Sequence, residues 1–101
     1  MTVKLVVLYT QPDDGETFDV HYLGEHMPGA ASIPGLQRAE SSRFVAAADG
    51  GEVSWFRMAE MWFDDEASLQ SALASDQGKA TAEDYQAIAP PGSRLFIVAV
   101  D

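Results

Sequence analysis

The chain has 101 residues and carries 16 acidic against 6 basic side chains, which gives a formal net charge of −10. This length suits a single domain, residues 1–101, with a modest core. The negative charge disfavours binding to nucleic-acid phosphates and to anionic membrane surfaces. No apolar stretch approaches the roughly 20 residues of a membrane span, whereas the hydrophobic fraction of 47% is that of a globular protein.

Cysteine is absent from the chain. This excludes disulfides, thiolate nucleophiles and cysteine-ligated metal sites, and it is typical of a protein in a reducing compartment. The N-terminal run has one basic residue, a very short apolar stretch and no small-residue cleavage site. We therefore expect a cytoplasmic protein without a signal peptide.

The first third of the chain predicts one strand followed by one helix. Residues 3–9 are apolar and rich in β-branched side chains, which is typical of a strand. Asp13 and Glu16 have the spacing of a capping box, so a helix is expected to begin there and to run to about residue 31 or 32. The sequence Ile33-Pro34-Gly35 then ends it.

The rest of the chain predicts a hairpin, a second helical region and a last strand. The expected elements are a strand over 36–47, a turn at Asp49-Gly50-Gly51-Glu52, a strand over 53–63, a helix from Asp64 that breaks at Asp76-Gln77-Gly78, a helical segment over 79–89 and a strand over 94–100. The acidic residues at 64–66 suit the positive end of a helix dipole.

The order β-α-β-β-α-β predicts a ferredoxin-like α+β fold, in which two helices cover one face of a four-stranded antiparallel sheet. The segment 53–63 has apolar residues at both parities, which is typical of a strand covered on both faces. Because the helices cover only one face, we expect the other to pack against a second copy of the chain.

Both histidines lie in the first predicted helix. At about 100° per residue, His26 falls near the middle of the apolar arc and should face the core. His21 falls on the outer face, where it can pair with Glu25 four residues later. Pro28 cannot donate a hydrogen bond to the carbonyl of Gly24, so the turn around His26 is expected to be kinked or loosened.

An inward His26 has more than one interpretation. A free pKa of about 6.5 suits proton transfer near neutral pH, and burial favours the neutral base. The other interpretation is a core histidine satisfied by one hydrogen bond. With His21 five residues away on the opposite face, the two histidines lack the i, i+4 spacing of a helical zinc pair. Ligation of haem by His26 alone stays open as an alternative.

Three residues of the predicted hairpin are further candidates. Glu60 lies in an otherwise apolar strand, where its carboxylate could orient His26, act as acid or base, or simply pair with a nearby arginine. Arg38 could hold an acidic ligand group, and Trp62 offers a flat apolar wall. Residues of these types also occur in interfaces between subunits.

These segments resemble the EthD-like family of dimeric α+β barrels. The resemblance is carried by Phe18-Asp19-Val20-His21-Tyr22 followed by His26-Met27-Pro28, by Ile33-Pro34-Gly35-Leu36 and by the run 59–65, and it covers nearly the whole chain. It implies a ferredoxin-like monomer, a homodimer formed sheet to sheet, and a small apolar pocket between sheet and helices. Gly29 stands where relatives often have leucine after His-x-Pro, which leaves the size of the pocket open.

The resemblance implies three hypotheses for function, because the superfamily includes cofactor-free oxygenases, polyketide cyclases and lactone isomerases. The first is a cofactor-free enzyme acting on a small apolar, aromatic or polyketide-like molecule, with His26 as general base and Glu60 as its partner. The residues expected around the substrate are Phe18, Tyr22, Arg38 and Trp62. The second is a non-catalytic binding or accessory protein, and the third is haem or metal handling through His26. The first two need neither cofactor nor metal.

Overall fold

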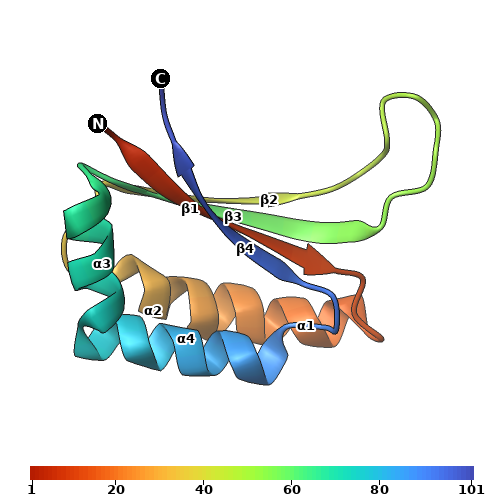
Figure 1. Cartoon of the computed structure of the whole chain (residues 1–101). Helices are drawn as coiled ribbons and strands as arrows, with labels where there is room; N and C mark the ends of the chain where they lie inside the picture. Colours follow the sequence, from red (N-terminus) through yellow and green to blue (C-terminus); the bar gives the residue numbers. More distant parts are fainter.

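The computed structural model describes residues 1–101 and shows one four-stranded antiparallel sheet with all helices packed on the same face (Figure 1). The sheet order is β2-β3-β1-β4. The strands are β1 (Val3–Thr10), β2 (Arg38–Arg43), β3 (Trp55–Phe63) and β4 (Arg94–Ala99). The helices are α1 (Gly15–His21), the π-helix η1 (Tyr22–His26), α2 (Met27–Ala31), α3 (Glu66–Ala74) and α4 (Asp76–Ile88). The predicted ferredoxin-like fold is confirmed.

Two helix starts differ from the predictions. Asp14, and not Asp13, caps α1, because its carboxylate accepts the backbone N–H groups of Glu16 and Thr17. The predicted break between the two helical segments is present but does not lie at Asp76-Gln77-Gly78, since α4 already begins at Asp76. The chain turns instead at Ser75, whose hydroxyl accepts the N–H of Gly78 at 3.0 Å and so caps the helix.

The hairpin arms are shorter than predicted. β2 ends at Arg43 and β3 begins at Trp55, and the loop 44–54 between them projects beyond the sheet (Figure 1). Gly50 has a φ of +80°, a backbone conformation that glycine adopts without steric cost, and its N–H bonds the carbonyl of Ala47 at 3.0 Å. The predicted turn therefore lies at the tip of a loop rather than in a tight hairpin.

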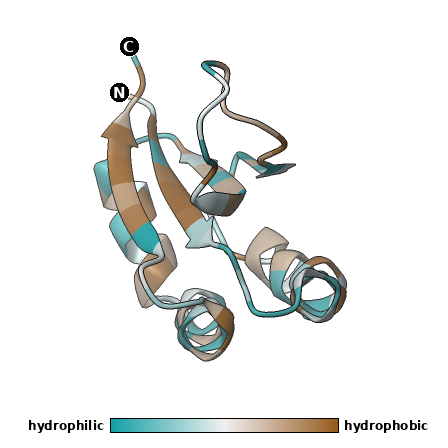
Figure 2. Cartoon of the chain, turned by 90° about the vertical axis from the view of Figure 1, so that its right-hand side faces the viewer, coloured by the Kyte–Doolittle hydropathy of each residue, from teal (hydrophilic) through white to brown (hydrophobic).

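Alternate residues of the central strands face the helices and form the core. In β1 these are Val3, Leu5, Val7 and Tyr9, and in β3 they are Ala59, Met61 and Phe63, all of them buried. Figure 2 shows the helices gathered on one side of the sheet, and the strands next to the two chain ends, β1 and β4, are coloured mostly as hydrophobic. None of these helices is long and apolar enough to cross a bilayer.

The opposite face of the sheet has no helix over it and combines apolar side chains of β1, β3 and β4 with charged ones, among them the ion pair of Arg38 and Glu40 on β2. Val6 lies opposite Phe96 in the β1–β4 ladder, and Phe96 and Val98 are 42% and 37% exposed. Polar groups on this face are paired side by side: Lys4 Nζ bonds Glu60 Oε2 at 2.8 Å. We call the residues Lys4, Val6, Leu8, Met58, Glu60, Trp62, Phe96 and Val98 the open face.

Helices α3 and α4 meet very closely at Gly78. A Cβ atom at this position would lie 2.1 Å from the carbonyl oxygen of Ala72 and 2.9 Å from Cα of Leu73. Only a residue without a side chain fits there. This contact brings the start of α4 directly against α3, and α4 carries several of the side chains described below.

Candidate functional site

The turn that carries His26 is a π-helix. The N–H of Met27 bonds the carbonyl of Tyr22, five residues earlier, and the next residue, Pro28, has no N–H to continue an α-helical ladder. The predicted loosening around His26 is therefore confirmed, and it takes the form of one inserted residue. Tyr22 and His26 are both buried in this segment. Single π-turns of this kind are frequent at functional sites.

The π-turn brings the two histidines to one carboxylate. With hydrogen bonds from residue i to i+5, residues five apart lie roughly one turn above each other, whereas in an α-helix they diverge by about 140°. His26 Nδ1 lies 2.6 Å from Asp84 Oδ2 and His21 Nε2 lies 2.7 Å from Asp84 Oδ1. The expectation that the histidines occupy opposite faces is thus wrong. The inward position of His26 and the pair between His21 and Glu25 are confirmed.

The charge states in this cluster follow from its hydrogen bonds. Burial by itself would raise the pKa of Asp84, but the bonds from His21 and His26 lower it below its usual value, so the carboxylate is ionised at neutral pH. The bond to Asp84 also raises the pKa of His21, with Glu25 adding to the effect. An ionised carboxylate only accepts hydrogen bonds, so each histidine nitrogen that faces Asp84 carries a proton.

The second nitrogen of His26 faces the hydroxyl of Tyr9. Nε2 and the Tyr9 oxygen are 3.3 Å apart, and Tyr9 is fully buried. Burial raises the pKa of Tyr9 far above its usual range, so its hydroxyl keeps its proton and can donate it. The network therefore assigns a hydrogen to Nδ1 of His26 and makes Nε2 the acceptor that faces the Tyr9 hydroxyl.

Aromatic rings hold the His26 imidazole in place. The ring of Tyr22 stacks on it with 5.8 Å between centroids and 19° between planes. Tyr22 is held in turn by the Arg57 guanidinium, which lies 5.4 Å from its ring centroid. Arg57 donates two hydrogen bonds to Asp19, at 2.7 and 3.0 Å, and the bond to Asp19 raises the pKa of Arg57. These contacts limit the rotation of His26.

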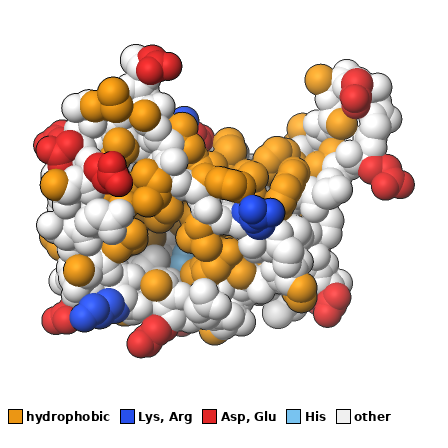
Figure 3. Space-filling model, in the orientation of Figure 1, with side chains coloured by type: hydrophobic (Ala, Val, Ile, Leu, Met, Phe, Trp, Pro, Cys, Tyr) orange, Lys and Arg blue, Asp and Glu red, His pale blue; other side chains and the backbone are white.

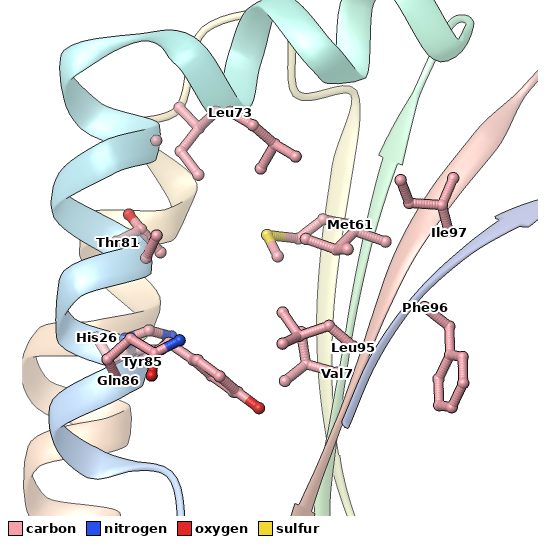
Figure 4. Close-up of a pocket in the computed structure, with 14 residues that line it drawn as sticks. Val7, His26, Met61, Leu73, Thr81, Tyr85, Gln86, Leu95, Phe96 and Ile97 are labelled. Atoms are coloured by element: carbon pink, nitrogen blue, oxygen red, sulfur yellow. The ribbon is translucent and has the colours of Figure 1, made fainter. Parts of the chain in front are cut away.

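His26 forms part of the wall of an apolar cavity of about 380 Å³ between the sheet and the helices. Figure 4 shows side chains of the strands on one side of it and side chains of α4 on the other, with Leu73 of α3 closing one end. In Figure 3 the hollow is open to the surface, ringed by hydrophobic side chains, and a histidine is visible inside it. From the sheet the lining includes Leu5, Val7, Met61, Leu95 and Ile97.

Polar groups are few in this apolar cavity. They are the side chains of His26, Thr81, Tyr85 and Gln86. The Tyr85 hydroxyl makes no hydrogen bond within the chain, and burial raises the pKa of Tyr85, so it stays a donor at neutral pH. No lysine, arginine, aspartate or glutamate lines the cavity. The site therefore offers one base, a few neutral polar groups and an otherwise apolar surface.

The structure brings only one of the predicted site residues to the cavity. His26 lines it, whereas Phe18 and Tyr22 lie in the core behind the imidazole. Glu60, Trp62 and Arg38 have the strand parity of the open face, on the far side of the sheet from His26.

Glu60 does not orient His26, contrary to the expectation. Its partner is Lys4 rather than an arginine or a histidine. Trp62 lies between two cations, with Lys4 Nζ 5.3 Å and Arg38 Cζ 4.7 Å from a ring centroid. Asp84 takes the orienting role that was expected of Glu60.

Haem or metal handling gains no support from the donor set. Both ring nitrogens of His26 already face protein groups. No cluster of three or more His, Cys, Asp or Glu side chains has an arrangement suited to a metal ion.

Comparison with known proteins gives the family. The EthD domain matches residues 11–89. This chain belongs to the EthD family. An ethyl tert-butyl ether D (EthD) family protein from Bacillus halodurans C-125 has 40% sequence identity and a TM-score of 0.94, with full coverage of both chains. An uncharacterised 11.0 kDa protein from the thcB-thcC intergenic region of Rhodococcus erythropolis is 29% identical over 93 residues, or 92% of this chain and 89% of that protein.

More distant structures share the fold alone. SnoaB, a cofactor-independent oxygenase from Streptomyces nogalater, is 17% identical with a TM-score of 0.70 and covers 98% of this chain and 92% of its own. The hydroxynitrile lyase of Passiflora edulis is 9% identical with a TM-score of 0.81, covering 99% and 94%. A dimeric ferredoxin-like protein from Jannaschia sp. CCS1 is 14% identical with a TM-score of 0.75, covering 99% and 100%. The fold thus occurs in more than one class of protein.

Proposed function

We propose that this EthD-family protein binds a small, uncharged, apolar molecule in the cavity and that His26 removes a proton from it without a cofactor. The observation that carries the proposal is the geometry of His26. Its ring is buried in the cavity wall, Asp84 fixes a proton on Nδ1, and Nε2, which faces the Tyr9 hydroxyl at 3.3 Å, is the nitrogen that can accept one. This is the arrangement of a general base held by a carboxylate.

The proton transfer can be written in full. An acidic C–H or O–H of the ligand gives its proton to Nε2, and the bonding electron pair stays on the ligand as an anion. The imidazolium that forms lies against Asp84, whose negative charge stabilises it. The contact from Tyr9 to Nε2 is long at 3.3 Å, so a ligand group competes with it at little cost. Depending on the ligand, the anion then isomerises, cyclises or reacts with O₂.

The lining of the cavity favours a neutral ligand. A carboxylate entering it would lose its hydration and meet no cation, because no lysine or arginine lines the walls. The whole chain carries a charge of −10, which further opposes anions. An aromatic or polyketide-like molecule with one hydroxyl fits better, since Tyr85 offers a free donor.

A non-catalytic binding role is the second candidate. It is favoured by one observation: both nitrogens of His26 face protein groups, as they would in a histidine whose role is only to hydrogen-bond its neighbours. The same cavity would then hold a ligand without chemistry. The two candidates differ in whether a bound hydroxyl reaches Nε2.

The test uses 2-naphthol as a probe, with 2-naphthoate as its charged counterpart. Calorimetry should show 2-naphthol binding at least about tenfold more tightly, because desolvating the carboxylate is costly. Naphthol becomes a strong acid when excited, so a base at hydrogen-bond distance gives naphtholate emission from the bound probe. His26→Gln should abolish that emission, while Val20→Ala, exposed on α1, should leave it unchanged.

Each outcome decides between the candidates. Tight binding with naphtholate emission that depends on His26 supports the general base. Binding with emission from neutral naphthol only, in the wild type as in His26→Gln, supports the non-catalytic role. Equal affinity for naphthoate, or no binding of naphthol together with no molecule found by mass spectrometry of the purified protein, overturns both.

We also infer that the chain forms a homodimer through its open face. The support is the exposed apolar surface of β4 and its neighbours, together with the dimeric ferredoxin-like protein that shares the fold. Each copy would cover the face that the helices leave bare. Sedimentation velocity at micromolar concentration should give the mass of two chains, and a stable monomer would contradict the inference.

A further inference from the structure

Asp84 is the middle of a chain of polar contacts that runs from the core to the surface. Tyr9 faces His26, His26 faces Asp84 and Asp84 faces His21, at 3.3, 2.6 and 2.7 Å. His21 Nδ1 then lies 2.6 Å from Glu25 Oε2. The side chain of His26 is 5% exposed and that of Glu25 is 72% exposed, so this series of contacts leads from the buried core to solvent.

The outer part of this chain borders a second, polar hollow of about 230 Å³. It is lined by Glu25, Asp84, Ser32, Gln77 and neighbouring residues, and His26 and Thr81 belong both to it and to the apolar cavity. His26 therefore stands between two spaces, one apolar and one polar. Groups on the polar side can exchange protons with water without passing through the apolar cavity.

His21 is placed as a cation. Each of its two nitrogens faces a carboxylate oxygen, Glu25 on one side and Asp84 on the other. Because ionised carboxylates accept and do not donate hydrogen bonds, both nitrogens must carry protons for both contacts to be hydrogen bonds. An imidazole with both nitrogens protonated bears a positive charge.

We propose that His21 is a positioning residue for His26: as an imidazolium between Glu25 and Asp84, it holds the Asp84 carboxylate in place and sets the tautomer and the basicity of the His26 ring. This rests on the proposed function, in which His26 is the base. The positive charge of His21 offsets part of the negative charge of Asp84. His26 then meets a carboxylate that fixes its Nδ1 proton but stabilises its protonated form less strongly than a lone aspartate would.

The π-helix makes this arrangement available. In an α-helix His21 and His26 would diverge, and one carboxylate could not reach both. The groups facing His21 are Glu25 of η1 and Asp84 of α4, and those facing His26 are Asp84 and the hydroxyl of Tyr9 from β1. Neither histidine has a lysine or arginine among its hydrogen-bond or ion-pair partners.

Nitrogen-15 NMR of the two imidazoles tests the proposal without any ligand. The chain has only two histidines, so His21→Gln leaves the signals of His26 alone. In the wild type near neutral pH, His21 should show two protonated nitrogens and His26 a protonated Nδ1 with a bare Nε2. Glutamine keeps a donor toward Asp84 but removes the charge. The pH midpoint of His26 protonation should therefore move upward, with proton affinity increased on the order of tenfold.

Companion variants separate positioning from a general effect of charge. His21→Lys restores a cation and should return the His26 midpoint toward that of the wild type. Asp84→Asn should mix the two tautomers of His26, and adding His21→Gln to it should then have little further effect. Glu83→Gln removes an exposed carboxylate next to Asp84 in the sequence and should leave His26 unchanged.

The proposal is overturned if His26 shows the same midpoint and tautomer in His21→Gln as in the wild type, or if His21 in the wild type titrates as a neutral imidazole around pH 7. Circular dichroism establishes that each variant is folded, and the wild-type spectrum alone decides the charge of His21 if a variant does not fold. If the naphthol experiment gives no His26-dependent naphtholate emission but the NMR results are as expected, the role of His26 as a general base is contradicted. The positioning of the His26 ring by His21 is still supported.

Discussion

Polar side chains form a connected network on one face of the sheet and separate pairs on the other, although both faces belong to the same strands. On the helix-covered face, Tyr9 of β1 joins a continuous network that runs through His26 and Asp84 beside a cavity. On the side of the sheet that carries the open face, the charged side chains form separate ion pairs, Lys4 with Glu60 and Arg38 with Glu40. Adjacent residues of one strand therefore belong to different environments.

The difference lies in what covers each face. Helices can supply side chains at many angles, so a carboxylate of α4 such as Asp84 can bind two groups from the helical segments α1 and η1. On a sheet face without helices, a side chain can contact only side chains of the same or neighbouring strands. Its charged side chains therefore pair with one another, and its apolar side chains stay exposed unless a second surface covers them. Chemistry is therefore expected under the helices, and association on the open face.

The helix cover should depend most strongly on Gly78. Gly78→Val places side-chain atoms where the Ala72 carbonyl and the Leu73 backbone lie, so α3 and α4 must separate. We expect a loss of about 3 kcal/mol or more in the free energy of unfolding, measured with urea. Gly29→Ala, at a helical position with open space around it, should be neutral or slightly stabilising. An unfolding midpoint in Gly78→Val equal to the wild type would mean that the close helix contact is absent.

A charge introduced on the open face should weaken dimerisation rather than the folding of the single chain. Phe96→Glu puts a carboxylate on the exposed surface of β4, where an isolated chain tolerates it. In a dimer it would be buried without a partner, so the dissociation constant should rise at least about 100-fold. Analytical ultracentrifugation over a dilution series measures this. Leu23→Glu, exposed on η1, is the matched control, and equal dissociation of the two variants would place the interface elsewhere.

The network under the helices should contribute a smaller, measurable part of stability. Asp84→Asn keeps the shape of the side chain, but it replaces a charged acceptor by one that cannot serve both histidines equally. We expect a loss of about 1–2 kcal/mol at pH 7 in urea unfolding. Glu83→Gln should change stability little, because Glu83 is exposed and forms no ion pair. Identical losses in both variants would show that only overall charge matters.

The pH dependence should be the smallest effect. The pKa of His21 is raised in the folded chain, so the folded state holds a proton that the unfolded state releases between the ordinary value and the raised one. Stability from this group is therefore full below about pH 6.5 and is lost as the pH rises through the raised pKa. Urea midpoints should fall across this window in the wild type, and this component should be missing in His21→Gln. A midpoint that rises with pH would contradict the assigned sign.

The fold could be predicted from the sequence because its signals are local. Apolar runs at residues 3–9 and 53–63, together with turn residues and helix caps, gave the right order of elements. The errors lie at the boundaries of elements. Gly78, for example, was interpreted as part of a helix break, but it lies inside α4. Its lack of a side chain serves a contact between two helices, and that contact cannot be seen along one helix.

The site was predicted only in part, for a geometric reason. The helical wheel placed His26 inward, and Pro28 indicated a loosened turn, but the extra residue of the π-turn changed the direction of His21. Asp84 lies on a helix far along the sequence, so its partners depend on how α4 crosses α1 and η1. For Glu60 the strand parity was readable, whereas the side of the sheet that the helices cover was not.

The alternation along β4 has a consequence for the assembled protein. Leu95 and Ile97 line the cavity, while Val98 points to the open face and the ring of Phe96 points away from the cavity in Figure 4. If two copies associate through that face, only the strand β4 separates a ligand in the cavity from the partner subunit. A ligand that displaced β4 would then also displace the surface against which the partner packs. Occupancy and self-association would be thermodynamically linked, and by reciprocity dilution to monomers would alter ligand affinity by the same factor that ligand alters the dimer equilibrium.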